Sequence, residues 1–228
     1  MTSVPPIDFT PQAACFDLDG TLLDSLDDLA DSMNAALREF GHPEHPTRDY
    51  RYLVGEGARL LVTRTLPEAH RDLETIETVF QRYQGIYREN WNCKTRPYPG
   101  IPELLDALQA RGLSLAVLSN KPHAFTVACV QELLGVWDFE VILGQRDSVP
   151  RKPDPAGVFE IAEKLRLAPS DFLYLGDTAV DMQTATAAGC VAVGVLWGFR
   201  EAEELLENGA QHLITTPLDL LELLPKRN

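Results

Sequence analysis

The first candidate segment is acidic and directly follows an apolar run. Asp17 and Asp19 come after residues 13–16, and Gly20 and Thr21 follow them. Two carboxylates two residues apart on an extended segment can face the same side, and the glycine lets the chain turn sharply. Because like charges this close repel, a bound cation would explain why both remain ionised. A solvated turn would also suit the Asp-Gly pair alone, but the full run Asp-x-Asp-Gly-Thr-Leu-x-Asp-Ser is far more specific.

A second acidic pair follows the apolar run 172–175. Asp177 and Asp181 are four residues apart at an expected helix start, so their side chains can share one face. Asp177 could instead cap that helix, since Asp is a favoured cap residue. Two acids at a strand tip in an acidic protein are more economically explained by a bound metal.

Two further segments supply polar and cationic groups. Ser119 and Asn120 follow the apolar run 113–118, and a hydroxyl and an amide there suit phosphate oxygens. Lys152 lies in a proline-rich loop that stiffens the backbone, and its charge could offset that of carboxylates and phosphate. The alternatives are that Ser119 caps the next helix and that Lys152 is solvated.

The elements that must position these groups alternate between strand and helix. Strands are expected from continuous apolar runs, at residues 13–16, 113–118, 141–143, 172–175, 191–196 and 212–214. Helices are expected between them, at residues 101–110, 123–134, 156–165, 179–188 and 201–207. This alternation predicts an α/β fold with a doubly wound parallel sheet. Since ligands bind beyond the carboxyl ends of such strands, all four polar segments are expected at one end of the sheet.

Residues 26–96 break the alternation. Helical patterns follow one another there, at residues 26–40, 47–52, 57–65 and 73–90. In the first of them an apolar face is formed by Leu26, Leu29, Met33, Leu37 and Phe40. We therefore expect a discontinuous core domain, residues 1–25 and 97–228, with a helical domain, residues 26–96, inserted after the first strand.

Composition excludes several classes of partner. The chain has 228 residues and a formal net charge of −14, which disfavours binding to nucleic acid or to an anionic membrane surface. Residues 1–11 lack the basic and then apolar pattern of a signal peptide, and no apolar stretch is long enough to span a bilayer. We therefore expect a cytoplasmic protein.

The four segments together resemble the motifs of the haloacid dehalogenase superfamily. They appear in the family's order as Asp17-x-Asp19-Gly20-Thr21, Ser119-Asn120, Lys152-Pro153 and Gly176-Asp177-x-x-x-Asp181. The helical insertion is similar to the family's α-helical cap. The resemblance covers essentially the whole chain, and it implies a phosphatase that acts on a small phosphorylated metabolite.

The resemblance also implies a role for each motif residue. Asp17 would attack phosphorus to form an aspartyl phosphate, and Asp19 would act as general acid and base. Phosphoryl oxygens would be held by Thr21, Ser119, Asn120 and Lys152. Mg²⁺ would be bound by Asp17, the Asp19 carbonyl oxygen and Asp177, with Asp181 bound directly or through water.

Within the superfamily the chain most resembles the phosphoglycolate phosphatases. The stretch 53–58 of the helical insertion supports this, as do residues 147–155 and 177–185. Gly55 and Gly57 flank Glu56 in a manner that suits a loop tip reaching the core, although an uncharged residue is typical at position 56. Substrate specificity is expected from these three residues and from Arg59, which could meet a substrate carboxylate.

Other activities remain compatible with the sequence. A sugar phosphomutase uses the same aspartyl phosphate, and a sugar phosphate, an amino-sugar phosphate, pyrophosphate or a nucleotide could be the substrate. A dehalogenase would not need Asp19, and a non-catalytic binding module should lack Asp17, Lys152 or Asp177. The chain could be a monomer or a homodimer.

Overall fold

The computed structural model of the protein describes residue 7 and residues 9–225. The expected lack of a signal peptide in residues 1–11 therefore lies partly outside the described residues. Among the helices that are described, none has the length and apolar character needed to cross a membrane.

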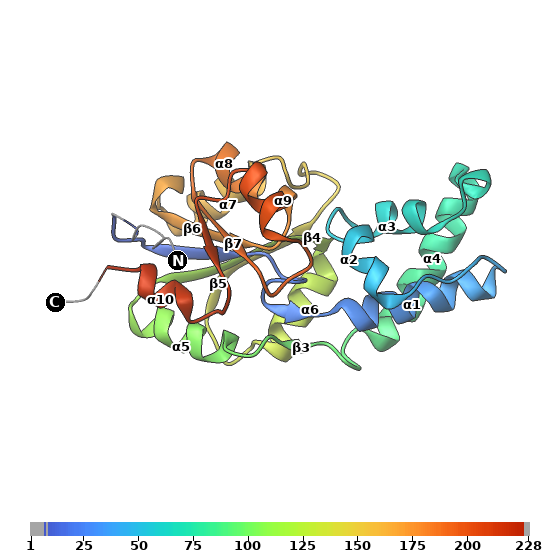
Figure 1. Ribbon diagram of the computed structural model, residues 1–228, viewed down its shortest axis with the longest axis horizontal. Helices are drawn as coiled ribbons and strands as arrows, with labels where there is room; N and C mark the ends of the chain where they lie inside the picture. The colour runs from blue at the N-terminus through green and yellow to red at the C-terminus, as the bar shows by residue number, and fades with distance from the viewer. Residues whose placement is uncertain (1–6, 8, 226–228) are drawn as a thin grey trace.

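A six-stranded parallel sheet forms the centre of the larger body of the protein (Figure 1). In spatial order its strands are β5 (Phe139–Gln145), β4 (Ser114–Pro122), β1 (Ala13–Phe16), β6 (Phe172–Gly176), β7 (Val191–Val195) and β8 (His212–Ile214). The strand order reverses at β1, which lies between β4 and β6. Ligands bind beside such a reversal in open α/β sheets. The predicted fold class is confirmed.

Helices cover both faces of this sheet. One face packs against α5 (Ile101–Ala110), α6 (His123–Leu133) and α10 (Asp219–Leu223), and the other against α7 (Ala156–Leu165), α8 (Ala179–Ala188) and α9 (Ala202–Glu207). In β1, Ala14 and Phe16 belong to the first apolar cluster, whereas Ala13 and Cys15 belong to the second. Because both faces are buried, the strand sequences are apolar throughout rather than alternating.

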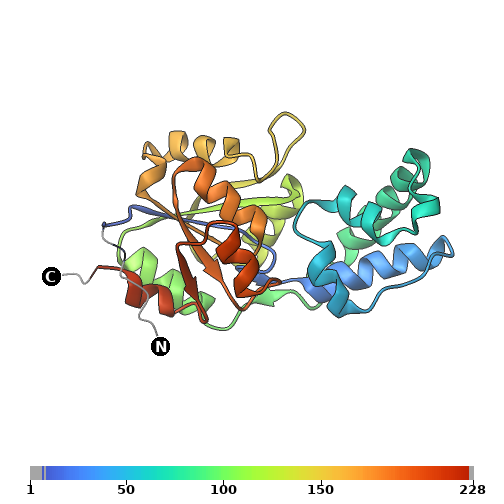
Figure 2. The same cartoon turned by 45° about the horizontal axis from the view of Figure 1, so that its top comes forward.

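A separate group of helices lies beyond one end of the sheet (Figures 1 and 2). It comprises α1 (Leu26–Glu39), α2 (Tyr50–Leu53), α3 (Ala58–Thr65) and α4 (Leu73–Asn90), with 3₁₀ turns at Thr47–Asp49 and Glu68–His70. We call residues 26–96 the helical unit. It has its own buried cluster, which includes Met33, Leu37 and Tyr50 and also Phe199 from the larger body.

The two connections of the helical unit run side by side. β2 (Leu23–Asp24) and β3 (Arg96–Pro97) pair antiparallel where the chain enters and leaves the unit. The buried Asp28 carboxylate accepts hydrogen bonds from the backbone N–H groups of Lys94 and Thr95, at 2.8–3.0 Å. The entry and exit of the unit are therefore fixed to each other.

Several helix ends differ from the sequence prediction. α1 ends at Glu39, and Phe40 is 41% exposed instead of completing the apolar face. α3 begins after Gly57, whose φ of 93° lies outside the helical region. The helix expected at 47–52 is a 3₁₀ turn followed by the short α2.

Candidate functional site

The ends of three neighbouring strands bring the predicted motifs together. In the register of the sheet, Phe16 of β1 is level with Val117 of β4 and Leu175 of β6. The residues that follow these positions therefore emerge at the same edge. Lys152 reaches this edge from the loop between β5 and α7.

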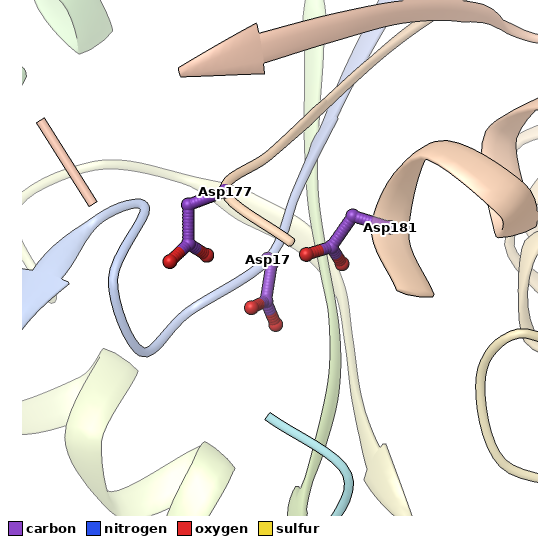
Figure 3. A group of neighbouring side chains, drawn as sticks. All are labelled: Asp17, Asp177 and Asp181. Carbon is purple, nitrogen blue, oxygen red and sulfur yellow. The ribbon is translucent and has the colours of Figure 1, made fainter. Parts of the chain in front are cut away.

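Three carboxylates form the centre of the site (Figure 3). Asp17 follows β1, Asp177 follows β6, and Asp181 lies in the first turn of α8. One oxygen from each lies within 4.8 Å of the others, and all three residues are buried. Three buried carboxylates this close require compensating positive charge.

Lys152 supplies part of that charge. Its Nζ lies 2.8 Å from Asp17 Oδ1 and 2.7 Å from Asp181 Oδ1, and it also donates to the Leu118 carbonyl oxygen. The residue is only 4% exposed, so the alternative of a solvated lysine is wrong. Burial alone would lower the pKa of Lys152, but the two carboxylates outweigh it and the pKa is raised.

Asp177 is held by the core rather than by its own helix. The N-cap of α8 is Thr178, so the alternative that Asp177 caps this helix is wrong. Thr21 Oγ1 donates to Asp177 Oδ1 at 3.1 Å, and the Phe199 backbone N–H donates to Oδ2 at 2.8 Å. Burial, reinforced by the charges of Asp181 and Asp17, raises the pKa of Asp177.

The Asp181 carboxylate is already engaged on both oxygens. Oδ1 accepts from Lys152, and Oδ2 accepts from the backbone N–H and Oγ1 of Thr178, at 3.1 and 2.6 Å. The Tyr174 hydroxyl also donates to Oδ1, at 3.4 Å. Because these four donors engage both oxygens, Asp181 is better suited to holding Lys152 than to binding a metal directly.

The donor set fits Mg²⁺. It consists only of oxygens, and no hydrogen bond to Oδ2 of Asp17 is found within the described residues. Burial raises the pKa of Asp17 to about 7, against the opposing effect of Lys152. A divalent cation would offset this cost of ionisation, and Mg²⁺ prefers a sparse set of carboxylate oxygens completed by water and phosphate.

The Asn120 side chain joins three parts of the site. Its Nδ2 donates to the carbonyl oxygens of Gly55 and Lys152 at 3.2 and 3.1 Å, and its Oδ1 accepts from the Lys152 N–H at 2.9 Å. Ser119 Oγ accepts from the Lys121 N–H at 3.2 Å. The N-cap of α6 is Pro122, so the alternative that Ser119 caps this helix is wrong.

A cavity separates the sheet edge from the helical unit, with a volume of about 610 Å³ that includes the solvent at its mouth. The sheet side contributes polar groups, and they are Asp17, Asp19, Ser119, Asn120 and Lys121. The helical side is mostly apolar, and its side chains are Leu29, Val54, Ala58, Leu61, Tyr83, Gln84 and Tyr87. Thr21 and Lys152 lie behind this surface, against the carboxylates.

The four specificity residues predicted in the helical unit lie in different places. Gly55 and Gly57 line the cavity. Glu56 forms an ion pair with Arg64, and Arg59 pairs with Glu77. Neither Glu56 nor Arg59 is among the residues that line the cavity, and their role in specificity remains a prediction.

Sequence reasoning missed the lysine that holds Asp19. Lys121 Nζ lies 2.9 and 3.0 Å from the two Asp19 oxygens and 2.6 Å from the Tyr87 hydroxyl of α4. Ser25 Oγ also donates to Asp19, at 2.6 Å. In the sequence, the feature that could have indicated this role is that Lys121 directly follows Ser119 and Asn120 near the end of β4.

Comparison with known proteins identifies relatives over most of the chain. Residues 14–195 match the family described as haloacid dehalogenase-like hydrolase. The phosphoglycolate phosphatase of Nitrosospira multiformis is 34% identical over 221 residues, which cover 94% of this chain and 96% of the relative. The enzyme of the same name from Neisseria meningitidis is 37% identical over 204 residues, covering 87% of this chain and 86% of the relative.

Solved structures show the same architecture. A protein from Lactobacillus delbrueckii subsp. bulgaricus superimposes with a TM-score of 0.88 at 29% identity, covering 96% of this chain and all of the other. A predicted phosphoglycolate phosphatase from Haemophilus somnus gives a TM-score of 0.84 at 30% identity, covering 95% of this chain and 99% of the other.

Proposed function

The chain belongs to the haloacid dehalogenase-like hydrolases, and from this premise we propose that it is a Mg²⁺-dependent phosphatase that hydrolyses 2-phosphoglycolate through an aspartyl phosphate. The observation that carries the proposal is the hydrogen bonding of the two Asp17 carboxylate oxygens. One of its oxygens is fixed by Lys152, and no hydrogen bond within the described residues occupies the other, which belongs to a residue lining the cavity.

The substrate is the finer part of the proposal. Support comes from the relatives named phosphoglycolate phosphatase, which align over nearly their whole length. We further propose that residues 26–96 form a cap domain on a core of residues 1–25 and 97–228. The cap would close the cavity from bulk water during the reaction.

In the first step, Asp17 attacks phosphorus, and the bond from phosphorus to the leaving oxygen breaks. Asp19 donates a proton to that oxygen, so that the alcohol leaves as a neutral hydroxyl. Ser119 holds a phosphoryl oxygen, and Lys152 offsets the charges of Asp17 and the phosphate. The Asn120 side chain, whose donors are taken by the Gly55 and Lys152 carbonyl oxygens, fixes the backbone of Lys152 beside them. Thr21 acts behind them by fixing Asp177.

In the second step, Asp19 takes a proton from the water that attacks phosphorus, the bond between phosphorus and the Asp17 oxygen breaks, and inorganic phosphate leaves with the Asp17 carboxylate restored. Asp17 and Asp177 would hold Mg²⁺, supported by the carbonyl oxygen of Asp19, while Asp181 keeps Lys152 in place. When bound, the ion neutralises charge shared between the nucleophile and the phosphate.

The experiment is phosphate release from 2-phosphoglycolate and a panel of other phosphate esters, with Mg²⁺ and with EDTA. We expect Mg²⁺-dependent release, with 2-phosphoglycolate the best substrate. Asp17→Asn should lower kcat by at least about 10³-fold, because it removes the nucleophile. Release that survives this substitution would contradict the proposed mechanism.

The panel also separates the alternatives. The best substrate in the panel could be a sugar phosphate, an amino-sugar phosphate, pyrophosphate or a nucleotide. In that case the proposed phosphatase activity would stand and the proposed substrate, 2-phosphoglycolate, would be wrong. Turnover of a sugar phosphate without net phosphate release would identify a mutase instead.

A further inference from the structure

Lys121 occupies the boundary between the polar and apolar sides of the cavity. The residue belongs to β4, and its Nζ reaches Asp19 of the core and Tyr87 of the helical unit. Among the described residues that line the cavity, it is the one cation. The side chain is 4% exposed, so the charge sits in a largely dehydrated environment.

This charge has partners different from those of the lysine at the carboxylate cluster. Lys152 forms ion pairs with two members of the cluster, Asp17 and Asp181. Among the described residues, no hydrogen bond or ion pair joins Lys121 to those two, and its Nζ lies 4.8 Å from the centre of the Tyr87 ring. The two buried lysines therefore pair with different groups, Lys152 with Asp17 and Asp181 and Lys121 with Asp19 and Tyr87.

We propose that Lys121 selects the substrate by binding a carboxylate on its leaving group. This inference rests on the proposed phosphatase function and names the residue that would make it specific for a small phosphorylated hydroxy acid. Apart from Lys121, the wall that meets the leaving group is mostly apolar, through Leu29, Val54 and Leu61. A second anionic group on the substrate would find its cationic partner at Lys121.

The Tyr87 hydroxyl completes the carboxylate site. It accepts a hydrogen bond from Lys121 Nζ, so its own hydrogen is available to a carboxylate oxygen. Tyr83 stacks against Tyr87, with ring centroids 5.7 Å apart, and holds that ring in place. A cation and a hydroxyl donor side by side form a suitable partner for a carboxylate.

The surroundings make this recognition selective. A charged pair in an apolar, dehydrated cavity is stronger than the same pair in water. Lys121 stays paired with Asp19 and Tyr87 when a substrate lacks the carboxylate, so the selectivity comes from the additional charge-assisted contact that a carboxylate gains. Glu56 and Arg59 are not required for this selection.

The test compares 2-phosphoglycolate with ethyl phosphate, which has the same two carbons and no carboxylate. Lys121→Met should lower kcat/KM for 2-phosphoglycolate by about 10²-fold and for ethyl phosphate by less than about 10-fold. Tyr87→Phe should lower the preference for 2-phosphoglycolate in the same direction by a smaller factor. Lys164→Met, on the exposed side of α7, removes the same charge away from the cavity and should change neither value.

A binding measurement separates recognition from catalysis. In Asp17→Asn protein, adding Lys121→Met should weaken the binding of 2-phosphoglycolate by about 10-fold or more and leave the binding of inorganic phosphate within about 3-fold. Equal losses for both ligands, or equal losses in kcat/KM for both esters, would overturn the inference and assign Lys121 to holding Asp19. Failure of the wild type to hydrolyse 2-phosphoglycolate would instead overturn the proposed substrate.

Discussion

The two sides of the cavity hold their side chains in different ways. On the sheet side the buried carboxylates and Lys152 form one set of contacts, in which Asp177 and Asp181 have fixed partners and Asp17 is fixed through Oδ1. On the helical side the cavity meets apolar side chains and the backbone of Gly55 and Gly57. The charge network would carry the chemistry, whereas the apolar side chains of the helical side lie outside it. Lys121 pairs with Asp19 on the sheet side, so its proposed part in selection is coupled to the chemistry.

The largest effect is expected from breaking the charge network. Lys152→Met removes the cation between two buried carboxylates, so we expect kcat/KM to fall by about 10³-fold or more and the free energy of unfolding by about 3 kcal/mol. Phosphate release and urea denaturation at pH 7.5 measure the two quantities. Lys164→Met is the matched control, and equal stability of the two variants would show that the network is not needed for folding.

Substitution of one glycine on each side of the cavity tests the difference between the sheet side and the helical side. Gly20 and Gly55 both have positive φ, 91° and 109°. A Cβ at Gly20 would overlap the Asp177 carboxylate, whereas at Gly55 it would meet only Thr178 Cγ2, at 3.5 Å. Gly20→Ala should therefore lower kcat by at least about 10²-fold.

For Gly55→Ala we expect only backbone strain, on the order of 1 kcal/mol of stability, and a change of a few fold in KM. Steady-state kinetics with the best ester and thermal denaturation compare the two variants. A similar fall in kcat for both would mean that the loop on the helical side belongs to the catalytic machinery.

The carboxylate cluster also predicts how stability depends on pH when metal is absent. Burial raises the pKa of Asp17 to about 7, so the folded state binds a proton more tightly than the unfolded chain does. The resulting stability is present at pH 5.5 and is lost as pH rises through about 7. This one group should lower the free energy of unfolding by about 2 kcal/mol between pH 5.5 and 8.5.

Urea denaturation in EDTA across this pH range measures that slope. Asp17→Asn should flatten it, and Mg²⁺ should raise stability most at the alkaline end. A slope that is the same in wild type and variant would assign the pH dependence to other groups.

The smallest effect is expected far from the network, in the helical unit. Arg59 pairs with Glu77 and packs over the Phe80 ring, and both members of the ion pair are substantially exposed. Arg59→Ala should change kcat/KM by less than about 2-fold and stability by less than about 1 kcal/mol. A 10-fold or larger loss for 2-phosphoglycolate alone would restore Arg59 as a specificity residue.

The same division between the two sides explains which features could be predicted from the sequence. Strands buried on both faces leave continuous apolar runs, and motif residues that directly follow them fall at a common edge. The contacts of Lys121 could not be read in this way, because Asp19 and Tyr87 are 102 and 34 residues away. Tyr87 falls within the helical pattern expected at residues 73–90, and nothing in that pattern distinguishes it from its neighbours.

Other errors have local causes. β2 and β3 have two residues each, too few for any periodic pattern. Phe199 follows an expected strand, and nothing near it in the sequence indicates that its ring joins the cluster of the helical unit. Lys121 and Phe199, which both contact the helical unit from the larger body, were therefore not identified from sequence patterns.

The position of Phe199 has a thermodynamic consequence. Its backbone N–H fixes Asp177, while its ring is buried with the helices, and Arg51 of α2 donates to its carbonyl oxygen at 3.1 Å. Phe199 therefore contacts both the larger body and the helical unit. If a ligand of Asp177 favours the seated position of Phe199, reciprocity requires that docking of the helices favour that ligand by the same factor. Ligand binding at Asp177 and docking of the helical unit would then be thermodynamically coupled, so that a change in either one shifts the other.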